Sequence, residues 1–290
     1  MIGRVTETVL PDWTQTWLTA SDGVQLAVYT VGSADAPAVV LVHGYPDDHS
    51  VWNTVAAELA RELRVIAYDV RGAGASDVPS ARAAYRVEQL ADDLGRVAAT
   101  AGGAPVHLLA HDWGSIQAWR AATGDDAPQR YASLTSVSGP DQAYAATWLA
   151  RALRTNRGAA LRQLASSWYV GLFLLPVVPD LLWTSGLGQR LLPKSAPARS
   201  IPDAVHGLNL YRANFASRSP GEPRRCVIAV QVLAPRHDQY LTPALVTQAP
   251  QPYVRDLRVT QIQGGHWGFV AHPERVTEPV RSFLAELSEA

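Results

Sequence analysis

The sequence has few of the residues that would point to disulfides or to nucleic-acid binding. Cys226 is its only cysteine, so no internal disulfide can form and a reducing compartment is allowed. Met1 is the only methionine and Lys194 the only lysine, a bias toward Arg and Ala that fits GC-rich coding. The net charge of −1 and the pI near 6.7 give no electrostatic reason to expect a nucleic-acid partner.

Long apolar runs are also scarce. Residues 1–20 lack the continuous apolar core of a signal peptide. Residues 168–183 are strongly apolar, but this stretch is shorter than a membrane span and contains Pro176 and Pro179. We therefore expect a cytoplasmic protein with no integral membrane segment.

The chain does contain a regular alternation of apolar strands and helical segments. Its 290 residues are enough for one α/β domain with an insertion. Two antiparallel strands are predicted over 14–20 and 24–31, and buried strands over 38–42, 65–68, 106–110, 131–137, 227–233 and 257–262. Helices are predicted over 51–63, 87–101, 243–247 and 274–287. This order predicts a mostly parallel central sheet that is flanked by helices on both faces.

The alternation stops after residue 140 and resumes near residue 226. The intervening stretch is helical in pattern and rich in apolar and aromatic residues. We therefore predict a core made of residues 1–140 and 226–290, with residues 141–225 inserted as a helical lid, or cap domain. Such a lid would cover the carboxyl ends of the strands.

The most informative stretch is residues 106–115, where an apolar strand runs directly into a helix at Asp112. A sharp strand-to-helix turn holds its central residue in a strained conformation and exposes that side chain at the strand's carboxyl end. Ala110 and Gly114 are the small neighbours that such a close approach requires. The pattern is that of a nucleophile elbow with Asp112 as the nucleophile; the alternative is an ordinary helix N-cap.

A carboxylate nucleophile limits which reactions and substrates are possible. It forms an alkyl ester by displacement at a saturated carbon, and water then attacks the carbonyl carbon of that ester. Suitable substrates carry a strained or good leaving group on an sp³ carbon, as epoxides and alkyl halides do. A serine esterase fits poorly, because Ser115 lies outside any G-x-S-x-G pattern.

Two further residues complete a predicted catalytic triad. His266, in a glycine-rich loop after the last strand, is placed to activate the hydrolytic water. Asp238, in the loop after the 227–233 strand, is the preferred acid to orient that histidine, and Asp141 is the alternative. The backbone N–H groups of Tyr45 and Trp113 are predicted to form an oxyanion hole, and a cis bond before Pro46 would help to aim the first of them.

These motifs resemble those of the epoxide hydrolase family of the α/β-hydrolase superfamily. The resemblance lies in His111-Asp112-Trp113-Gly114 and His43-Gly44-Tyr45-Pro46, and it covers nearly the whole chain. Those enzymes carry Gly where this chain has Ala110. The chain is also similar to the hydrolase half of longer bacterial proteins that continue into a reductase domain, and we expect no part of that second domain in these 290 residues.

The resemblance implies that two lid tyrosines donate a proton to the epoxide oxygen. Residues 167–173 and 208–212 resemble the two tyrosine segments, which places Tyr169 and Tyr211. Trp168, Phe173 and Trp267 are expected to line the substrate site. The predicted partners are a small hydrophobic epoxide and water, and the predicted reaction gives a vicinal diol, as in detoxification. No metal-ligand cluster is visible and no cofactor is expected. The sequence leaves open whether the chain forms a homodimer through the lid.

Two other functions remain open from the sequence. A haloalkane dehalogenase would share Asp112 and His266 and would hold the halide with the Trp113 indole. It would also need a second halide donor, for which Trp148, Trp168 and Trp183 are candidates, since Tyr45 stands where such enzymes often have Asn. The third reading is an inert binding protein that kept the fold without turnover.

Overall fold

The computed structural model describes residues 10–193, 196–197, 199–216 and 220–289. The start of the predicted core, residues 1–9, and Lys194 therefore lie outside the described residues. Within the described part, no helix has both the length and the apolarity needed to cross a bilayer.

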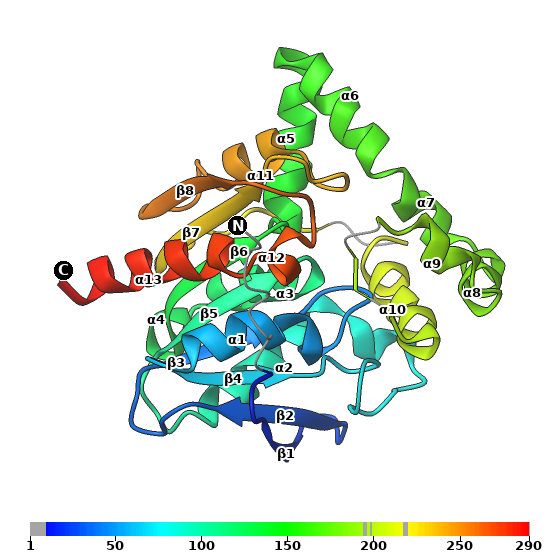
Figure 1. Cartoon of the computed structure of the whole chain (residues 1–290). Helices are drawn as coiled ribbons and strands as arrows, with labels where there is room; N and C mark the ends of the chain where they lie inside the picture. The colour runs from blue at the N-terminus through cyan, green and yellow to red at the C-terminus, as the bar shows by residue number, and fades with distance from the viewer. Residues whose placement is uncertain (1–9, 194–195, 198, 217–219, 290) are drawn as a thin grey trace, which may run out of the picture.

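The centre of the structure is an eight-stranded sheet in the order β1-β2-β4-β3-β5-β6-β7-β8 (Figure 1). β1 and β2 pair antiparallel, β2 runs antiparallel to β4, and the remaining neighbours are parallel. This confirms the predicted N-terminal hairpin and mostly parallel sheet. The strands are β1 (Thr14–Thr19), β2 (Gln25–Val31), β3 (Ala38–Val42), β4 (Arg64–Tyr68), β5 (Val106–His111), β6 (Tyr131–Val137), β7 (Ala229–Pro235) and β8 (Leu257–Ile262).

The central strands are apolar on both faces because each face supports its own core. In β3, Val40 and Val42 belong to one cluster of buried residues, whereas Val39 and Leu41 belong to the other. Successive side chains of a strand point to opposite faces, so a strand covered on both sides must be apolar at every position.

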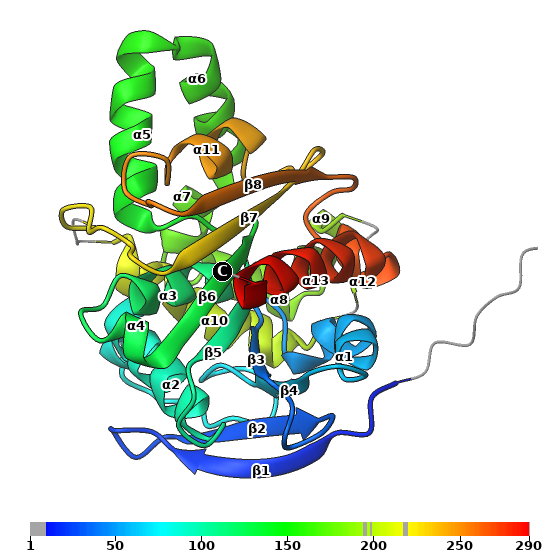
Figure 2. The same cartoon turned by 90° about the vertical axis from the view of Figure 1, so that its left-hand side faces the viewer.

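Helices cover both faces of the sheet, as Figure 2 shows, with α1 and α13 on one side and α2 and α3 on the other. The first pair is bounded by Asn53–Leu59 and Glu274–Glu289, and the second by Val87–Ala99 and Trp113–Ala122. The shorter helices of this part are η1 (His49–Trp52), η2 (Arg82–Tyr85), α4 (Ala127–Arg130), α11 (Pro243–Gln248) and α12 (Gly268–Ala271).

A run of helices separates β6 from β7, in the region predicted to be the lid. We call it the helical insertion. In Figure 1 it rises above the sheet at α5 and α6 and continues down one side through α7, α8 and α9 to α10. Its helices are α5 (Gln142–Thr155), α6 (Arg157–Ser166), α7 (Trp168–Leu174), α8 (Val178–Thr184), α9 (Leu187–Leu191) and α10 (Ile201–Asn214).

Most predicted bounds differ from the structure by one or two residues, and two of the differences have a clear physical cause. The 51–63 helix is a 3-10 turn followed by α1, which ends at Leu59, because Glu62 and Leu63 both bond back to the Leu59 carbonyl and turn the chain into β4. The 227–233 strand is shifted by two residues, because pairing with β6 begins only at Ala229 while Val227 is exposed.

Candidate active site

The turn between β5 and α3 carries Asp112 in a backbone conformation that L-residues rarely adopt, with φ at 53° and ψ at −121°. The Asp112 N–H donates to the Val137 carbonyl at 3.0 Å, and the Asp112 carbonyl accepts from the Ile116 N–H at 3.0 Å. Any side chain at Gly114 would collide with the Val42 backbone carbonyl, which explains the glycine two residues after the turn. These hydrogen bonds to β6 and α3 keep Asp112 in its strained backbone conformation.

The Asp112 carboxylate is nearly buried and its two oxygens have different neighbours. Oδ1 accepts a 2.8 Å hydrogen bond from the backbone N–H of Tyr45, and Oδ2 lies 3.6 Å from Nε2 of His266. Burial by itself raises the pKa of the Asp112 carboxyl, but the nearby His266 and the Tyr45 N–H outweigh it. The net pKa lies below the ordinary value, so the group is an anion at neutral pH.

His266 lies between two carboxylates. Its Nδ1 atom is 2.9 Å from Oδ2 of Asp238, and its Nε2 atom faces Asp112. Burial alone lowers the pKa of the His266 imidazole, but the carboxylates of Asp238 and Asp112 raise it to about 10. His266 follows β8 and Asp238 follows β7, so the carboxyl ends of neighbouring strands bring them together.

Asp238 and Asp141, the two acids considered from the sequence, have different environments. Oδ1 of Asp238 accepts the N–H groups of Tyr240 and Leu241, which leaves Oδ2 for His266. Asp141 instead caps α5, accepting from the N–H groups of Ala143 and Tyr144 at 2.8 and 2.9 Å. The structure therefore pairs Asp238 with the histidine and uses Asp141 as a helix cap.

Tyr169 on α7 and Tyr211 on α10 lie together on the insertion side of Asp112. Their ring centroids are 6.0 Å apart, with the rings nearly perpendicular. Burial is the main cause that raises the pKa of both phenols well above the ordinary value, so both keep their protons. The charge of Asp112 adds to it at Tyr169, and the neighbouring Tyr169 and then Asp112 add to it at Tyr211. The two rings also pack against Phe173, each in an edge-on contact.

Two cavities meet at these residues, and Asp112, Tyr169 and Tyr211 line both. The first has a volume of about 590 Å³, which includes space open to solvent, and its walls include the predicted Trp168, Phe173 and Trp267. Trp168 is 62% exposed at its rim, whereas Trp267 is buried and donates its indole N–H to Asp47 at 3.0 Å. The second has a volume of about 1250 Å³, which also includes space open to solvent. Its apolar walls include Trp113, Ile116, Leu149, Leu164, Val170 and Phe215.

The candidate halide donors of the alternative function lie in different environments, although Trp168 and Trp183 both line the first cavity. The Trp148 indole N–H donates to the Gln248 side chain at 2.9 Å, and the Trp168 side chain is largely exposed. Trp183 is buried and lines the first cavity, and its indole N–H has no hydrogen-bond partner among the described residues. Trp183 is therefore the candidate whose position best suits a ligand in this cavity.

Some residues of the site were not identified from the sequence. Tyr240 lines the first cavity, with its ring centroid 5.0 Å from that of His266. Its position two residues after Asp238 was a signal that could have found it. Asp47 is buried beneath Trp267 and forms an ion pair with Arg199, which belongs to the segment between α9 and α10. No local sequence pattern indicates that long-range pair.

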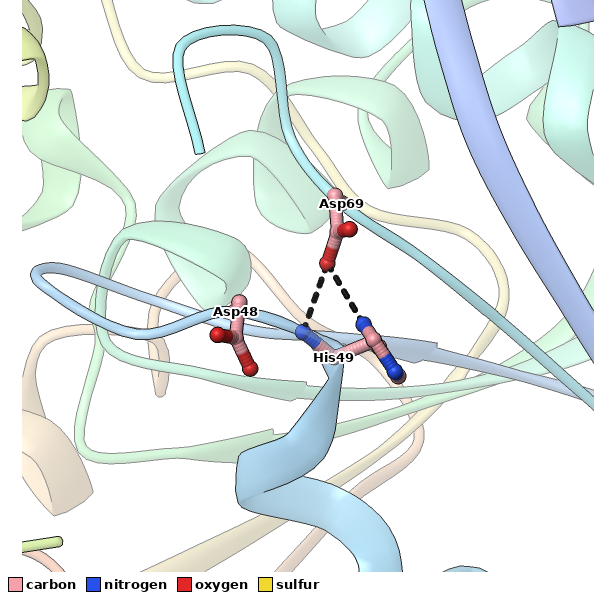
Figure 3. A group of neighbouring side chains, drawn as sticks. All are labelled: Asp48, His49 and Asp69. Carbon is pink, nitrogen blue, oxygen red and sulfur yellow. Dashed lines mark hydrogen bonds and ion pairs between the residues drawn. The ribbon is translucent and has the colours of Figure 1, made fainter. Parts of the chain in front are cut away.

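One group of metal-ligating side chains stands out in the described part of the chain, formed by Asp48, His49 and Asp69 (Figure 3). Asp69 already accepts four hydrogen bonds, two from His49 and one each from Tyr29 and Ala75. Asp48 caps the following turn by accepting from the Ser50 N–H at 2.8 Å. With both oxygens of Asp69 and one of Asp48 already accepting hydrogen bonds, this group holds loops together.

Comparison with known proteins agrees with this fold. The profile of a family described as "alpha/beta hydrolase fold" matches residues 37–167. "Probable oxidoreductase EphD" of Mycobacterium tuberculosis is 36% identical over an alignment that covers 92% of this chain and 49% of that protein. This chain thus spans about half the length of that relative. "Epoxide hydrolase 3" of Xenopus tropicalis is 26% identical, with 91% of this chain and 76% of that protein covered.

Solved structures show the same fold. An epoxide hydrolase from metagenomes of hot environments superposes with a TM-score of 0.80 at 23% identity, covering 94% of this chain and 98% of the other. Bacillus megaterium epoxide hydrolase in complex with an inhibitor gives a TM-score of 0.77 at 22% identity, covering 93% of this chain and all of the other. The chain therefore has the α/β-hydrolase fold, and it is similar to proteins named as epoxide hydrolases.

Proposed function

We propose that this protein hydrolyses hydrophobic epoxides to vicinal diols through a covalent ester on Asp112. The observation that carries the proposal is the pairing of Tyr169 with Tyr211. These phenols come from different helices of the insertion, have rings 6.0 Å apart and line both cavities with Asp112. Epoxide opening releases an alkoxide that must be protonated. Two protonated phenols that face the Asp112 carboxylate can donate this proton.

In the first step, Oδ2 of Asp112 attacks one carbon of the epoxide from the side opposite the ring oxygen. The carbon–oxygen bond breaks, and Tyr169 or Tyr211 gives its proton to the oxygen. Oδ2 is the attacking atom because Oδ1 is already held by the Tyr45 N–H at 2.8 Å. The product of this step is an alkyl ester of Asp112 that carries a hydroxyl on the neighbouring carbon.

Ester formation also prepares the histidine. The charge of Asp112 helps to raise the pKa of His266 to about 10, so alkylation, which removes that charge, lowers this pKa. His266 can then pass its proton toward the tyrosinate left by ring opening and become a neutral base. Asp238 stays hydrogen-bonded to Nδ1 and keeps Nε2 directed at the ester.

In the second step, His266 takes a proton from water and the resulting hydroxide attacks the ester carbonyl carbon. Negative charge develops on Oδ1, where the Tyr45 N–H already donates and the Trp113 N–H is the second proposed donor. The bond between the Asp112 carbonyl carbon and the alkyl oxygen breaks, the alkyl oxygen takes the proton from His266, and the diol leaves. One diol oxygen thus comes from Asp112 and is replaced by oxygen from water.

We also propose that the helical insertion, predicted as residues 141–225, acts as a lid on the core of residues 1–140 and 226–290. It supplies both phenols and much of the apolar wall of both cavities. Because the cavities meet at Asp112, a substrate with its epoxide between two apolar arms has a place for each arm. The substrate-binding roles of Trp168, Phe173 and Trp267 follow from the first cavity.

A single-turnover experiment tests the mechanism. Excess enzyme reacts with styrene oxide in ¹⁸O-labelled water, and peptide mass spectrometry locates the label. The expected result is label in Asp112 after one turnover, with an unlabelled diol, and accumulation of the ester in His266→Gln. Full and stable turnover by Asp112→Asn, or label that enters the diol first, would refute the covalent scheme.

The orphan indole N–H of Trp183 favours haloalkane dehalogenation as the second candidate. This proposal requires the Trp183 indole, which packs edge-on against Tyr45, to turn its N–H toward a halide in the first cavity. Release of chloride or bromide from a panel of haloalkanes, without turnover of epoxides, would replace the first proposal by this one. High affinity for apolar ligands with neither activity would favour an inert binding protein.

A further inference from the structure

The helical insertion exposes much of its apolar surface. Most of the exposed large apolar side chains of the described residues belong to it, although it is a minor part of the chain. A concentration of exposed apolar side chains of this kind is typical of an interaction site. We call the following residues the outer apolar surface: Leu161, Leu164, Trp168, Leu175, Val177, Val178, Leu181, Leu187 and Leu191.

The spacing of these residues places them on outward helix faces. Leu161 and Leu164 are three residues apart on α6, Val178 and Leu181 three apart on α8, and Leu187 and Leu191 four apart on α9. Residues three or four apart lie on the same side of a helix. Between α6 and α8, the helix α7 has the sequence WYVGLFL and contains no buried residue.

Figure 1 shows α6, α7, α8 and α9 following one another along the outer edge of the molecule, away from the sheet. The residues of the outer apolar surface therefore belong to consecutive elements along this edge of the fold.

Arginine predominates in this region, where Asp180 on α8 is paired with Arg212. Between residues 142 and 179 the sequence has four arginines, Arg151, Arg154, Arg157 and Arg162, and no Asp, Glu or Lys. All four are exposed, and the ion pairs within the described residues use none of them. Arg190 adds an exposed cation on α9. The chain as a whole has a net charge of −1, so the excess of arginine is local.

The outer apolar surface is continuous with the mouth of the first cavity. Trp168 and Leu191 belong to both, being 62% and 60% exposed while also lining the cavity that contains Asp112. A ligand that moved from an apolar phase into the cavity past Trp168 and Leu191 would meet apolar side chains at these two positions.

We propose that the helical insertion docks on an anionic lipid surface. Exposed apolar side chains at helical spacing enter the headgroup region, while unpaired arginines attract anionic headgroups. A second copy of this chain fits less well, because a two-fold contact through α6–α9 would place two arginine-rich surfaces of like charge against each other. Docking itself does not depend on the reaction; the corollary that lipid-dissolved epoxides enter past Trp168 and Leu191 rests on the proposed function.

Co-sedimentation of the full chain with vesicles tests the docking. The vesicles contain phosphatidylcholine alone or phosphatidylcholine with phosphatidylglycerol, at low and at high salt. We expect binding to the anionic vesicles that weakens as salt rises. Arg154→Gln with Arg162→Gln should weaken partitioning about fivefold for each arginine removed. Leu161→Gln with Leu181→Gln should abolish it.

Matched controls carry the same kinds of change elsewhere. Arg61 is exposed at the end of α1 and uses no ion pair among the described residues, and Val259 is 40% exposed on β8. Arg61→Gln and Val259→Thr should bind vesicles as the parent does. Turnover of styrene oxide in solution, measured for all variants, separates a failure of docking from a failure of the proposed function.

Three outcomes would overturn the docking proposal. The first is no binding to anionic vesicles, and the second is equal binding to neutral and anionic vesicles. The third is a dimer in light scattering that Leu161→Gln with Leu181→Gln dissociates, which would make a second copy the occupant of the surface.

Discussion

The phenol O–H of Tyr45 donates a 2.7 Å hydrogen bond to the backbone carbonyl of Ala204 on α10. The backbone N–H of the same tyrosine donates to Asp112. Tyr45 therefore connects the candidate nucleophile of the core with the helix that carries Tyr211. The distance between the Asp112 carboxylate and the Tyr211 phenol therefore depends on how closely α10 approaches the Tyr45 ring.

Gly207 sets the approach of α10 to Tyr45, because a Cβ there would lie 2.5 Å from Cδ2 of the ring. Gly207→Ala should destabilise the fold by about 1–3 kcal/mol through overpacking and lower epoxide turnover by shifting Tyr211. Gly171 on α7 has nothing near its Cβ position, so Gly171→Ala should be neutral or stabilising by up to about 1 kcal/mol. Thermal unfolding and kcat measure both. Equal behaviour of the two variants would contradict this role of Gly207.

Mutations of Asp141, which follows β6, and of Asp238, which follows β7, should have different effects on turnover. Asp238→Asn should lower turnover on the order of 10³-fold, because Nδ1 of His266 loses the carboxylate that fixes its tautomer. The lost step is ester hydrolysis, so intact-protein mass spectrometry should show the alkylated enzyme. Asp141→Ala should cost about 1 kcal/mol of stability as a lost helix cap and leave turnover in place. Reversed results would make Asp141 the catalytic acid.

Removing one phenol oxygen at a time tests proton donation. Tyr169→Phe and Tyr211→Phe should each lower kcat for epoxides by roughly 10–100-fold, and the double variant by more, since general acid catalysis contributes about 10²–10⁴-fold. The rings remain, so their edge-on contacts with Phe173 and the melting temperature should be kept. Tyr253→Phe, which alters a ring stacked on Tyr144 away from the cavities, is the matched control. Unchanged kcat in both single variants would remove these phenols from the mechanism.

The contacts of His266 with Asp112 and Asp238 make the free energy of unfolding depend on pH. The pKa of His266 is about 10 in the folded protein and about 6.5 in an unfolded chain. Since the folded pKa is the higher one, the native state binds the proton more tightly, and the stabilisation is complete below pH 6.5 and lost as pH rises toward 10. The free energy of unfolding of the parent minus that of His266→Gln should therefore fall across this window. Urea titrations at several pH values measure it, and a difference that is flat or rises with pH contradicts the assignment.

Several features of the fold followed from the sequence because local rules decide them. The 131–137 and 257–262 strands were predicted with the bounds that the structure shows, since apolar runs between turn residues are enough to locate buried strands. The position of Asp112 between β5 and α3 also followed, because an apolar strand, small neighbours and a helix occur in one continuous stretch. The predicted α/β-hydrolase fold is confirmed by the sheet and by the comparisons.

Other features depended on contacts between distant residues. Asp238 and Asp141 both follow strands, and only the path of the two loops decides that Asp238 meets His266 while Asp141 caps α5. The buried pair of Asp47 and Arg199 joins residues far apart in the chain, and no periodicity signals it.

The sequence by itself determined the order of strands and helices, the residue at the sharp turn and the apolar character of the insertion. Each of these depends on neighbours within a few residues, whose spacing is written directly in the chain. Only the tertiary structure decided which phenols face Asp112, that two cavities meet there, and which apolar side chains of α6–α9 stay exposed. Those depend on how helices far apart in sequence pack together, because a side chain's burial is set by what covers it and not by its own type.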